Sequence, residues 1–468
     1  IPTPIINRNS GEVVLVEIPA RVGEKNEKNS EGKLKWWQLS LIGVGCTIGT
    51  GYFLGSGIGI SKTGPSIVIS FILAGLTAMI VSELLGKMFV QDPQKGSFRS
   101  YAKKAFGRWA GFSSGWVYWF SEMLISGSQL TALSILTRFW FPNIPLWILA
   151  SIYAALGIIV VLIGTKGFER AENLFAVMKV AAIFMFIILA TLLLFGFFGG
   201  SIRDFNVPNT PDELFANGLT GLWSSLIFGF YAFGGIEIMG ILSVRLEQKK
   251  EVIKSTTVML IMLLSIYIIS IVLASTLVAF DQFNAEESPF VIALADYNLN
   301  FFPHVFNAGI IIAGFSTMAA SLFAVTSMLV TMAEEGDAPK LFSKKGKLKV
   351  PPFALALTIS ILVISIVISR LVPDKVYEYI TTAAGLMLIY NWFFILVSFP
   401  KLIKATTFDH IKRISAMLLI LLAVSGTIFD KTNRMGFFVS ILFVALVLIV
   451  ILFMRKGKKK KNELPRGV

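Results

Sequence analysis

The sequence has little charge and almost no cysteine or histidine. Only 15% of its 468 residues are charged, one is cysteine (Cys46) and two are histidine (His304 and His410). A soluble domain carries about 25% charged residues, so the composition disfavours a large globular enzyme. One cysteine excludes an internal disulfide and a cysteine-rich metal site, and the two histidines lie near predicted loops. We therefore expect neither a metal nor a cofactor.

The chain also lacks the short motifs that carry hydrolysis or nucleotide binding. No serine-hydrolase, zinc-protease or phosphate-loop pattern lies between a predicted strand and helix. Each of these chemistries needs its residues at a fixed turn or helix face, so the absence of the pattern disfavours both catalysis and ATP-driven work. We expect that the protein is not an enzyme.

Long apolar runs dominate the chain. Hydrophobic residues make up 55% of it and the mean hydropathy is +0.75. Apolar runs close in length to the ~20 residues needed to cross a bilayer recur along the sequence. The sequence predicts twelve spans, at Trp37–Ile60, Ser66–Val90, Gly111–Phe139, Leu146–Ile163, Leu174–Phe197, Leu219–Ser243, Ser255–Val278, Val305–Met332, Phe353–Leu371, Val376–Ser398, Ile414–Phe429 and Gly436–Met454.

The basic residues predict how these spans are oriented. With both termini inside, most of the 42 lysines and arginines fall in the termini and the even-numbered loops, as the positive-inside rule requires. The net charge of +14 therefore reports topology first and contact with anionic lipid headgroups second, and no soluble part is left to bind nucleic acid. We expect a multi-pass plasma-membrane protein with a cytoplasmic arm over residues 1–36, which has no signal-peptide pattern, and a basic cytoplasmic tail over residues 455–468.

Glycines crowd the middle of the first span. Residues 42–59 read IGVGCTIGTGYFLGSGIG, densest around Gly49-Thr50-Gly51. Backbone amides left unpaired in lipid cost several kcal/mol each, so a helix break at this depth is tolerated only where it lines a cavity. The amides that the break frees then become ligands for a bound small molecule.

The sixth span carries a second interruption at Gly234-Gly235. Spans one and six each open a block of five, and interrupted segments at matching positions indicate an inverted-repeat transporter with its site between them. We predict one transmembrane domain over residues 37–454, with repeats at about 37–197 and 219–398 and extra helices over 411–454. Glycines that only allow close helix packing are the alternative, which accounts for Gly55 and Gly59.

Several motifs in order along the chain resemble one known family. They are CTIGTGYFLGSG (Cys46–Gly57), GSFRSYA (Gly96–Ala102), GWVYW (Gly115–Trp119), KGFERAENLF (Lys166–Phe175), Lys179, FGGIE (Phe233–Glu237) and MAEEGDAP (Met332–Pro339). Together they resemble the amino acid transporter branch of the amino acid–polyamine–organocation superfamily. The resemblance implies an all-α membrane fold of twelve helices, a five-plus-five inverted repeat with helices one and six broken, and an L-α-amino acid as substrate.

The resemblance also implies where the substrate lies. The amides of Thr50 and Gly51 would hold the substrate carboxylate, while carbonyls near Ile48, Tyr231 and Phe233 would hold the ammonium group. Partial charges at half-helix ends suit this division. Phe233 would cover the substrate and Tyr231 would contribute to a gate, although ordinary packing is the alternative for both rings. The predicted substrate site is Ile48, Gly49, Thr50, Gly51, Tyr231, Phe233, Gly234, Gly235 and Glu122.

Two ionisable residues inside spans bear on the coupling ion. Lys179 lies in the fifth span, where related proton-driven carriers have a lysine in place of a sodium ion. A buried lysine can lose its proton, so Lys179 either carries the coupling proton or ties helix five permanently to the first break. Glu237 follows the second break, where either a protonation role or a hydrogen-bonded helix cap fits. Both readings of Lys179 disfavour sodium at that position.

Three positions depart from the family pattern. Arg245 stands where many members have a glutamate, and Ser327 stands where they have an arginine, which suggests a rewired cytoplasmic gate. Gln129 replaces an acid in span three, while Glu122 lies two helical turns earlier on the same face. Glu122 could receive a polar or cationic substrate side chain, carry a proton or pair with a neighbouring helix, so polar neutral, branched-chain, aromatic and basic substrates all stay open.

Together the sequence favours proton-coupled symport of L-α-amino acids by alternating access. An amino acid exchanger with the same site is the main alternative, and a membrane sensor that binds without transport is a weaker one.

Overall fold

The computed structural model describes residues 3–6, 13–16, 34–94, 96–163, 165–197, 206–295, 301–344, 346, 350–372 and 375–462. A hairpin of β1 (Thr3–Ile6) and β2 (Val13–Val16), which the sequence analysis did not anticipate, lies in the predicted N-terminal arm. The rest of that arm up to residue 33, part of the basic run over 340–349 and tail residues 463–468 lie outside the described residues.

The predicted first repeat is helical from residue 36 onward. It consists of α1 (Trp36–Thr47), α2 (Thr50–Phe53), α3 (Gly55–Thr63), α4 (Ile67–Gln91), α5 (Ser97–Phe106), α6 (Arg108–Thr137), α7 (Leu146–Ile163) and α8 (Thr165–Leu194). The predicted first span is thus three short helices, because glycines interrupt it. The fourth predicted span coincides with α7, whose apolar run has no interruption.

The remaining helices lie in the predicted second repeat and the predicted extra helices. They are α9 (Pro211–Leu214), α10 (Gly218–Ala232), α11 (Glu237–Leu242), α12 (Val252–Leu277), α13 (Pro289–Ala295), α14 (Phe301–Glu334), α15 (Pro352–Leu371), α16 (Val376–Leu402), α17 (Thr407–Phe429) and α18 (Lys431–Asn462). Short 3-10 turns lie at Gly64–Ser66, Ser243–Arg245, Lys249–Glu251, Phe280–Gln282 and Lys340–Ser343.

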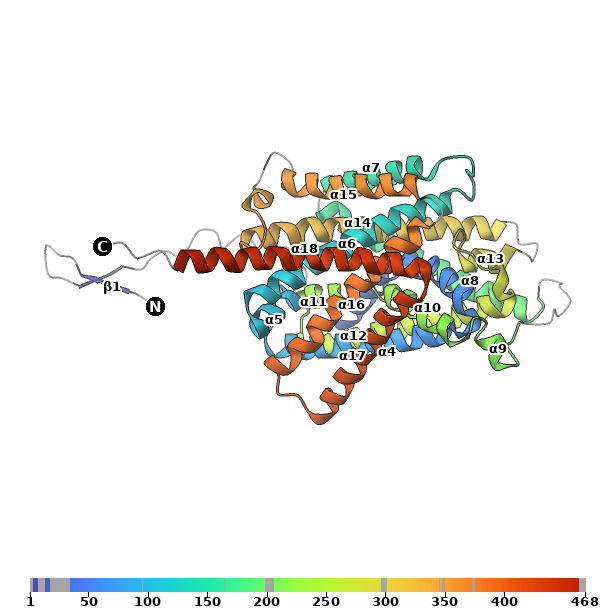
Figure 1. The fold of residues 1–468 in the computed structure, drawn as a ribbon, viewed down its shortest axis with the longest axis horizontal. Coiled ribbons are helices and arrows are strands. Elements are labelled where there is room, and N and C mark those ends of the chain that lie inside the picture. The colour runs from blue at the N-terminus through green and yellow to red at the C-terminus, as the bar shows by residue number, and fades with distance from the viewer. Residues whose placement is uncertain are drawn as a thin grey trace.

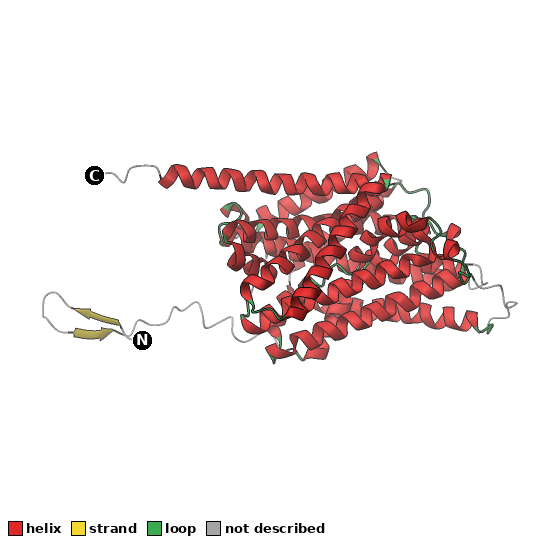
Figure 2. Cartoon of the chain, turned by 60° about the horizontal axis from the view of Figure 1, so that its bottom comes forward, coloured by secondary structure: helices red, strands yellow, loops and turns green. Residues whose placement is uncertain are grey.

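The helices of the two repeats interleave rather than forming separate bundles (Figure 1). α6 packs against α14 and α16, α4 packs against α10 and α12, and α17 and α18 cover α10 and α16. Many of the long helices run roughly along the length of the bundle, and others cross them at an angle (Figure 2). This interleaving places α1–α3 and α10–α11, the two interrupted segments, in the interior.

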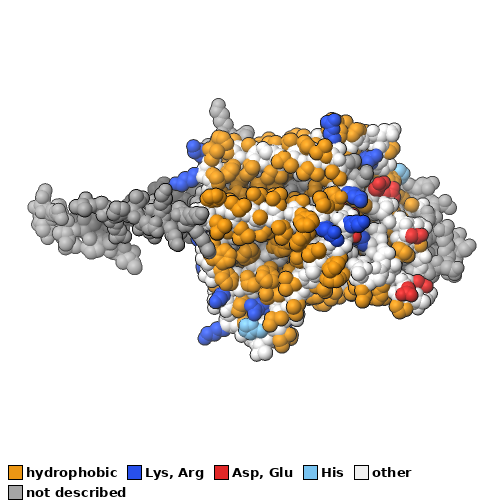
Figure 3. All heavy atoms as spheres, viewed as in Figure 1, with side chains coloured by type: hydrophobic (Ala, Val, Ile, Leu, Met, Phe, Trp, Pro, Cys, Tyr) orange, Lys and Arg blue, Asp and Glu red, His pale blue; other side chains and the backbone are white. Residues whose placement is uncertain are grey.

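The outer face matches a protein that lies in lipid. A broad apolar band crosses the molecule, with charged side chains gathered toward its two ends and carboxylates at the end near α9 and α13 (Figure 3). α7 contributes Ile152, Leu156 and Ile159, each more than 40% exposed. Exposing so many large apolar side chains to water would be unfavourable, so the band is the lipid-facing surface.

Ten helical stretches within the described ranges are long and apolar enough to span a membrane. One of them, Thr50–Gln91, joins the second half of the first predicted span to the second span. The third predicted span corresponds to the 30-residue α6, which is not among these ten stretches. Its many serines, glycines and threonines and its Glu122 lower its hydropathy. The structure is therefore all-α and polytopic as predicted, while the count of twelve spans stays a prediction.

Candidate substrate site between two broken helices

The first break lies at Ile48 and Gly49. α1 ends at Thr47, both residues have extended backbone dihedrals, and α2 begins at Thr50. Within the described part of the chain, no backbone hydrogen bond has the amide of Thr50 or Gly51 as its donor. The first amides of a helix have no partner inside it. Both amides are therefore available to an anion.

The second break lies at Phe233–Ile236, between α10 and α11. Gly235 has φ +102°, a conformation that L side chains rarely adopt. A Cβ added there would lie 3.4 Å from the carbonyl oxygen of Cys46, in the last turn before the first break. The two breaks therefore lie within van der Waals contact of each other, and glycine at 235 is required by its dihedral.

A cavity of about 40 Å³ lies between the two breaks. It is lined by residues from both breaks together with α6 and α14: Cys46, Thr47, Gly49, Gly51, Glu122, Ile125, Gln129, Tyr231, Ala232, Gly234, Gly235, Ile238, Thr317, Ala320 and Ser321. This volume holds roughly three waters, at about 10–15 Å³ each. An amino acid therefore needs the surrounding helices to separate before it can bind here.

Side chains from α6 and α16 hold Thr50 from two directions. The Thr50 hydroxyl donates to Oε1 of Gln129 at 2.6 Å, and the Tyr377 hydroxyl donates to the Thr50 carbonyl at 2.9 Å. Tyr231 lies against Gly51 and its hydroxyl is 2.5 Å from that of Ser128. The first break is thus fixed by neighbouring helices rather than by its own helix.

Not every predicted site residue lines the cavity. Glu122, Gly49, Gly51, Tyr231, Gly234 and Gly235 do, whereas Ile48, Thr50 and Phe233 are not among the lining residues. The Phe233 ring instead packs 5.3 Å from that of Tyr267 and close to Gly75 of α4. In this conformation Phe233 therefore lies behind the second break rather than over the cavity.

Lys179 is completely buried on α8. Its ammonium nitrogen donates to the carbonyl oxygen of Gly45 at 2.7 Å, in the last turn of α1. A charged and a neutral amine can both make this bond, so the contact fits both roles considered for Lys179. The contact also places the amine of α8 against the last turn of α1, next to the first break.

Glu237 is buried at the start of α11 and accepts two hydrogen bonds. One comes from the amide of Gly235 at 3.1 Å, and the other from the Trp392 indole of α16. This arrangement ties the turn before α11 to the first residue of α11 and to α16. A carboxylate at a helix start is also favoured by the helix dipole.

An ion network closes one end of the bundle, which we expect to be cytoplasmic. Asp337, with a side chain 0% exposed, contacts Arg99 of α5 at 2.5 Å and Arg108 of α6 at 2.9 Å. Its carbonyl accepts from the Trp116 indole at 3.1 Å, and Glu335 lies 3.1 Å from Arg99. The network therefore joins the segment just after α14 to α5 and α6.

The gate residue predicted from the sequence lies elsewhere at that end. Arg245 is half-buried in the turn after α11, where its carbonyl accepts from the amide of Leu34 at 2.8 Å. Ser327 is exposed on α14. The contacts of Arg245 thus tie the second break to the segment before α1.

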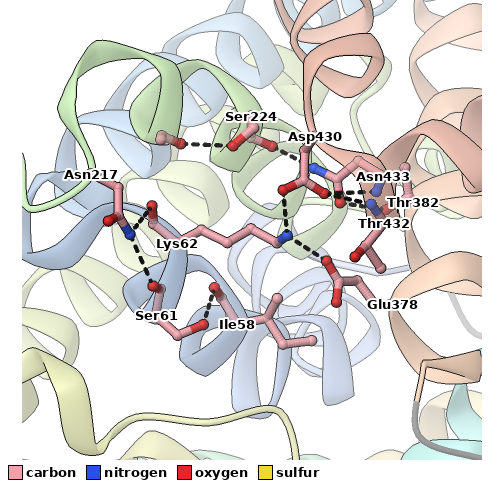
Figure 4. A network of polar contacts seen from close by, with 11 residues as sticks. Ile58, Ser61, Lys62, Asn217, Ser224, Glu378, Thr382, Asp430, Thr432 and Asn433 are labelled. Carbon is pink, nitrogen blue, oxygen red and sulfur yellow. Dashed lines mark hydrogen bonds and ion pairs between the residues drawn. The ribbon is translucent and has the colours of Figure 1, made fainter.

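A second ion network lies at the opposite end (Figure 4). Lys62 of α3 lies 2.6 Å from Glu378 of α16 and 3.0 Å from Asp430, in the turn between α17 and α18. Burial by itself would raise the pKa of Asp430. The backbone amides of Asn433 and Thr432 and the Lys62 ammonium outweigh it and hold that pKa below its usual value.

Sequence reasoning missed several of these residues. Tyr377, Thr317, Ser321 and Trp392 lie on helices far along the chain from the breaks, in motifs of no special composition. A signal did exist for the ion network at the α5 end. Arg99 and Asp337, which form the buried ion pair of that network, lie inside GSFRSYA and MAEEGDAP. These are two of the motifs that carried the family resemblance.

These features define a class of protein. An all-α bundle with a lipid-facing surface and two helices broken around a central cavity is the architecture of a membrane transport protein.

The comparisons with known proteins give the family. The profile of the family described as "Amino acid permease" matches residues 38–463. An uncharacterised transporter, YcgH, of Bacillus subtilis strain 168 is 52% identical over 94% of this chain and 99% of its own length. Aromatic amino acid transport proteins named AroP are 33% identical in Corynebacterium glutamicum, over 81% of this chain and 83% of the relative, and 29% in Escherichia coli K12, over 92% of each. The chain belongs to the amino acid permease family, a transporter family rather than an enzyme family.

Proposed function

We propose that the protein takes up L-α-amino acids across the plasma membrane by proton-coupled symport, alternating access around the cavity between the two breaks. The observation that carries the proposal is the pair of donor amides at Thr50 and Gly51 beside that cavity. They suit the substrate carboxylate, and the carbonyls of the adjoining helix ends suit its ammonium group.

Aromatic amino acids are the first candidates for the substrate, because the named AroP relatives transport them. Glu122 and Tyr231 line the cavity and would face the substrate side chain, with Phe233 swinging over it in another conformation. A thermal-shift screen of all twenty amino acids on the purified chain would rank the substrates, since a ligand that binds the folded state raises its melting temperature.

The coupling ion is tested by uptake into proteoliposomes. We expect a pH gradient, acidic outside, to drive accumulation without sodium, because the Lys179 ammonium lies where a cation would contact Gly45. Accumulation under a sodium gradient alone, with no response to pH, would contradict symport with protons.

Amino acid exchange is the second candidate. It is favoured if Lys179 stays charged as a tether to Gly45 through the whole cycle, because no proton then moves. Uptake that needs internal amino acid and is indifferent to pH would assign exchange.

A further inference from the structure

A cavity larger than the one between the breaks lies outside the central site. It has a volume of about 190 Å³ and lies at the end of the bundle that carries Lys62, which we expect to be extracellular. The C-terminal end of α6, the loop before α13 and the starts of α7, α14 and α16 enclose it. By the measure of about 10–15 Å³ per water, it holds roughly a dozen waters, which is room for one amino acid.

The walls of this outer cavity carry charges of both signs. Arg138 lies on one side, and Glu286 and Glu287 lie on the loop before α13. Arg138 uses two of its nitrogens on the carbonyl of Pro142, and its guanidinium has further N–H donors. Partial burial and then the neighbouring Glu286 carboxylate raise the pKa of Glu287, so a cationic group here would relieve the repulsion.

A buried hydroxyl in the wall indicates a ligand. Ser288 is 0% exposed, lines the cavity, and its Oγ has no hydrogen-bond partner among the residues that the structure describes. Leaving a buried hydroxyl unpaired costs about 1–3 kcal/mol, so an occupant that pairs with it is favoured. Asn307, also buried, donates its amide to the Leu136 carbonyl at 2.9 Å, and its own carbonyl oxygen can accept from an occupant.

The Tyr377 side chain links the outer cavity to the first break. Tyr377 lines the outer cavity, and its hydroxyl donates to the carbonyl of Thr50 in the first break. The next residue, Glu378, also lines the outer cavity and lies 2.6 Å from Lys62, which is shared with Asp430. A ligand in the outer cavity would thus lie beside a side chain that contacts the first break.

We propose that the outer cavity is a second binding site for a zwitterionic L-amino acid, which waits there before it enters the central site. Arg138 would hold the carboxylate, Glu286 and Glu287 the ammonium group, and Ser288 one of the polar ends. The charges of both signs fit a zwitterion better than a metal ion, and the described residues include no cluster of three metal-ligating side chains. The identity of this ligand rests on the proposed function.

The test is the number of L-phenylalanine molecules that one chain binds. Tritiated L-phenylalanine is titrated to saturation on the purified full-length protein, and we expect close to two per chain. Ala285→Trp, which fills the outer cavity, should halve the bound label. Ala279→Trp is the matched control, because Ala279 lies six residues earlier on the same loop and does not line the cavity. It should leave the count at two.

A second variant guards against misfolding of Ala285→Trp. Arg138→Gln should weaken the outer site at least tenfold and leave the central one unchanged, while Arg138→Lys should restore part of the affinity. A wild-type count of one, a count of two in Ala285→Trp, or no binding of L-phenylalanine would each overturn the proposal. Failure of proton coupling would change pH-driven uptake but not this count, so the two proposals can fail separately.

Discussion

At the scale of single residues, the site depends on side chains that fix the first break from outside its own helix. Gln129 and Tyr377 each bond to Thr50, from α6 and α16. The amides of the break can only receive a carboxylate if they are held in position. Preorganisation by these neighbours therefore bears directly on substrate affinity.

We predict that Gln129→Ala raises the KM for the transported amino acid by up to about tenfold. It removes the 2.6 Å bond to the Thr50 hydroxyl, and one such bond contributes about 0.5–1.5 kcal/mol. Gln129→Glu keeps the acceptor and is the control, with a KM near that of the wild type. Initial uptake rates in proteoliposomes measure both. An unchanged KM in Gln129→Ala would show that Thr50 is held without this bond.

Lys179 can be assigned by two substitutions. Lys179→Ala should abolish pH-driven accumulation, because it removes the ammonium and leaves the Gly45 carbonyl without this donor. Lys179→Arg keeps a donor that does not lose its proton. If Lys179 carries the coupling proton, Lys179→Arg retains counterflow but loses accumulation. Accumulation at the wild-type level in Lys179→Arg would instead assign the tether role.

At the scale of elements, the second break requires glycine at position 235. We predict that Gly235→Ala abolishes uptake, because φ +102° strains any other L residue and a backbone shift that relieves this strain would move the second break away from Cys46 and Thr47. Gly218→Ala is the matched control. Gly218 also has positive φ, at +65°, but an added Cβ meets nothing within 4 Å.

The control should cost only the backbone penalty, about 1–2 kcal/mol, and leave KM unchanged. Thermal unfolding and initial uptake rates measure the two effects. Equal loss of uptake in Gly218→Ala and Gly235→Ala would mean that backbone strain at any positive-φ glycine, and not the position of Gly235 between the breaks, inactivates the protein.

The turn between α17 and α18 gives a pH prediction. The folded-state pKa of Asp430 is lowered, so the ionised carboxylate stabilises the folded state. This contribution is present above the unfolded pKa of about 3.9 and is lost as the pH falls through the folded-state pKa. We predict that Asp430→Asn lowers the melting temperature at pH 7 by roughly 2 °C. This difference should shrink as the pH falls below about 4.

Asp281→Asn is the control, because Asp281 is an exposed carboxylate in another loop. Its melting temperature should match the wild type at both pH values. A difference for Asp430→Asn that persists unchanged at low pH would indicate lost packing rather than lost charge.

At the scale of the whole molecule, the structure is closed at the α5 end. Asp337 joins α14 to α5 and α6, while the outer cavity reaches down to Tyr377 at the other end. Under the proposed alternating access, the Asp337 network would break when the central site opens toward that end. In the structure this network holds α14, α5 and α6 together at the predicted cytoplasmic end.

We predict that Asp337→Asn shifts the protein toward a conformation that is open at the α5 end. Removing one partner of a buried ion pair costs about 3–5 kcal/mol, because Arg99 is left buried with a charge. Cys46, the single cysteine, lines the central cavity and reports the change. Labelling by a membrane-impermeant maleimide from the α5 side should rise at least tenfold.

Glu335→Gln is the matched control, because Glu335 contacts the same arginine but is 38% exposed. Screening by solvent makes such a contact weak, so labelling should stay near the wild-type level. Labelling of Asp337→Asn no faster than that of the control would exclude Asp337 as a closing contact.

The sequence by itself determined the membrane fold and the two breaks. Apolar runs long enough to cross a bilayer have few alternatives to membrane helices. Gly49 and Gly235 mark backbone positions where a regular helix ends. The family motifs pointed to the residues around the first break and to Lys179. These features are local, so a single stretch of sequence carries them.

Only the tertiary structure decided what meets at the breaks and at the two ends. Gln129 and Tyr377 reach Thr50 from positions 79 and 327 residues away, and Arg99 meets Asp337 across 238 residues. The orientation of the Phe233 ring toward Tyr267, and the outer cavity between α6, α14 and α16, depend on how the repeats interleave. Side-chain contacts between helices distant in sequence follow from packing, which no local pattern records.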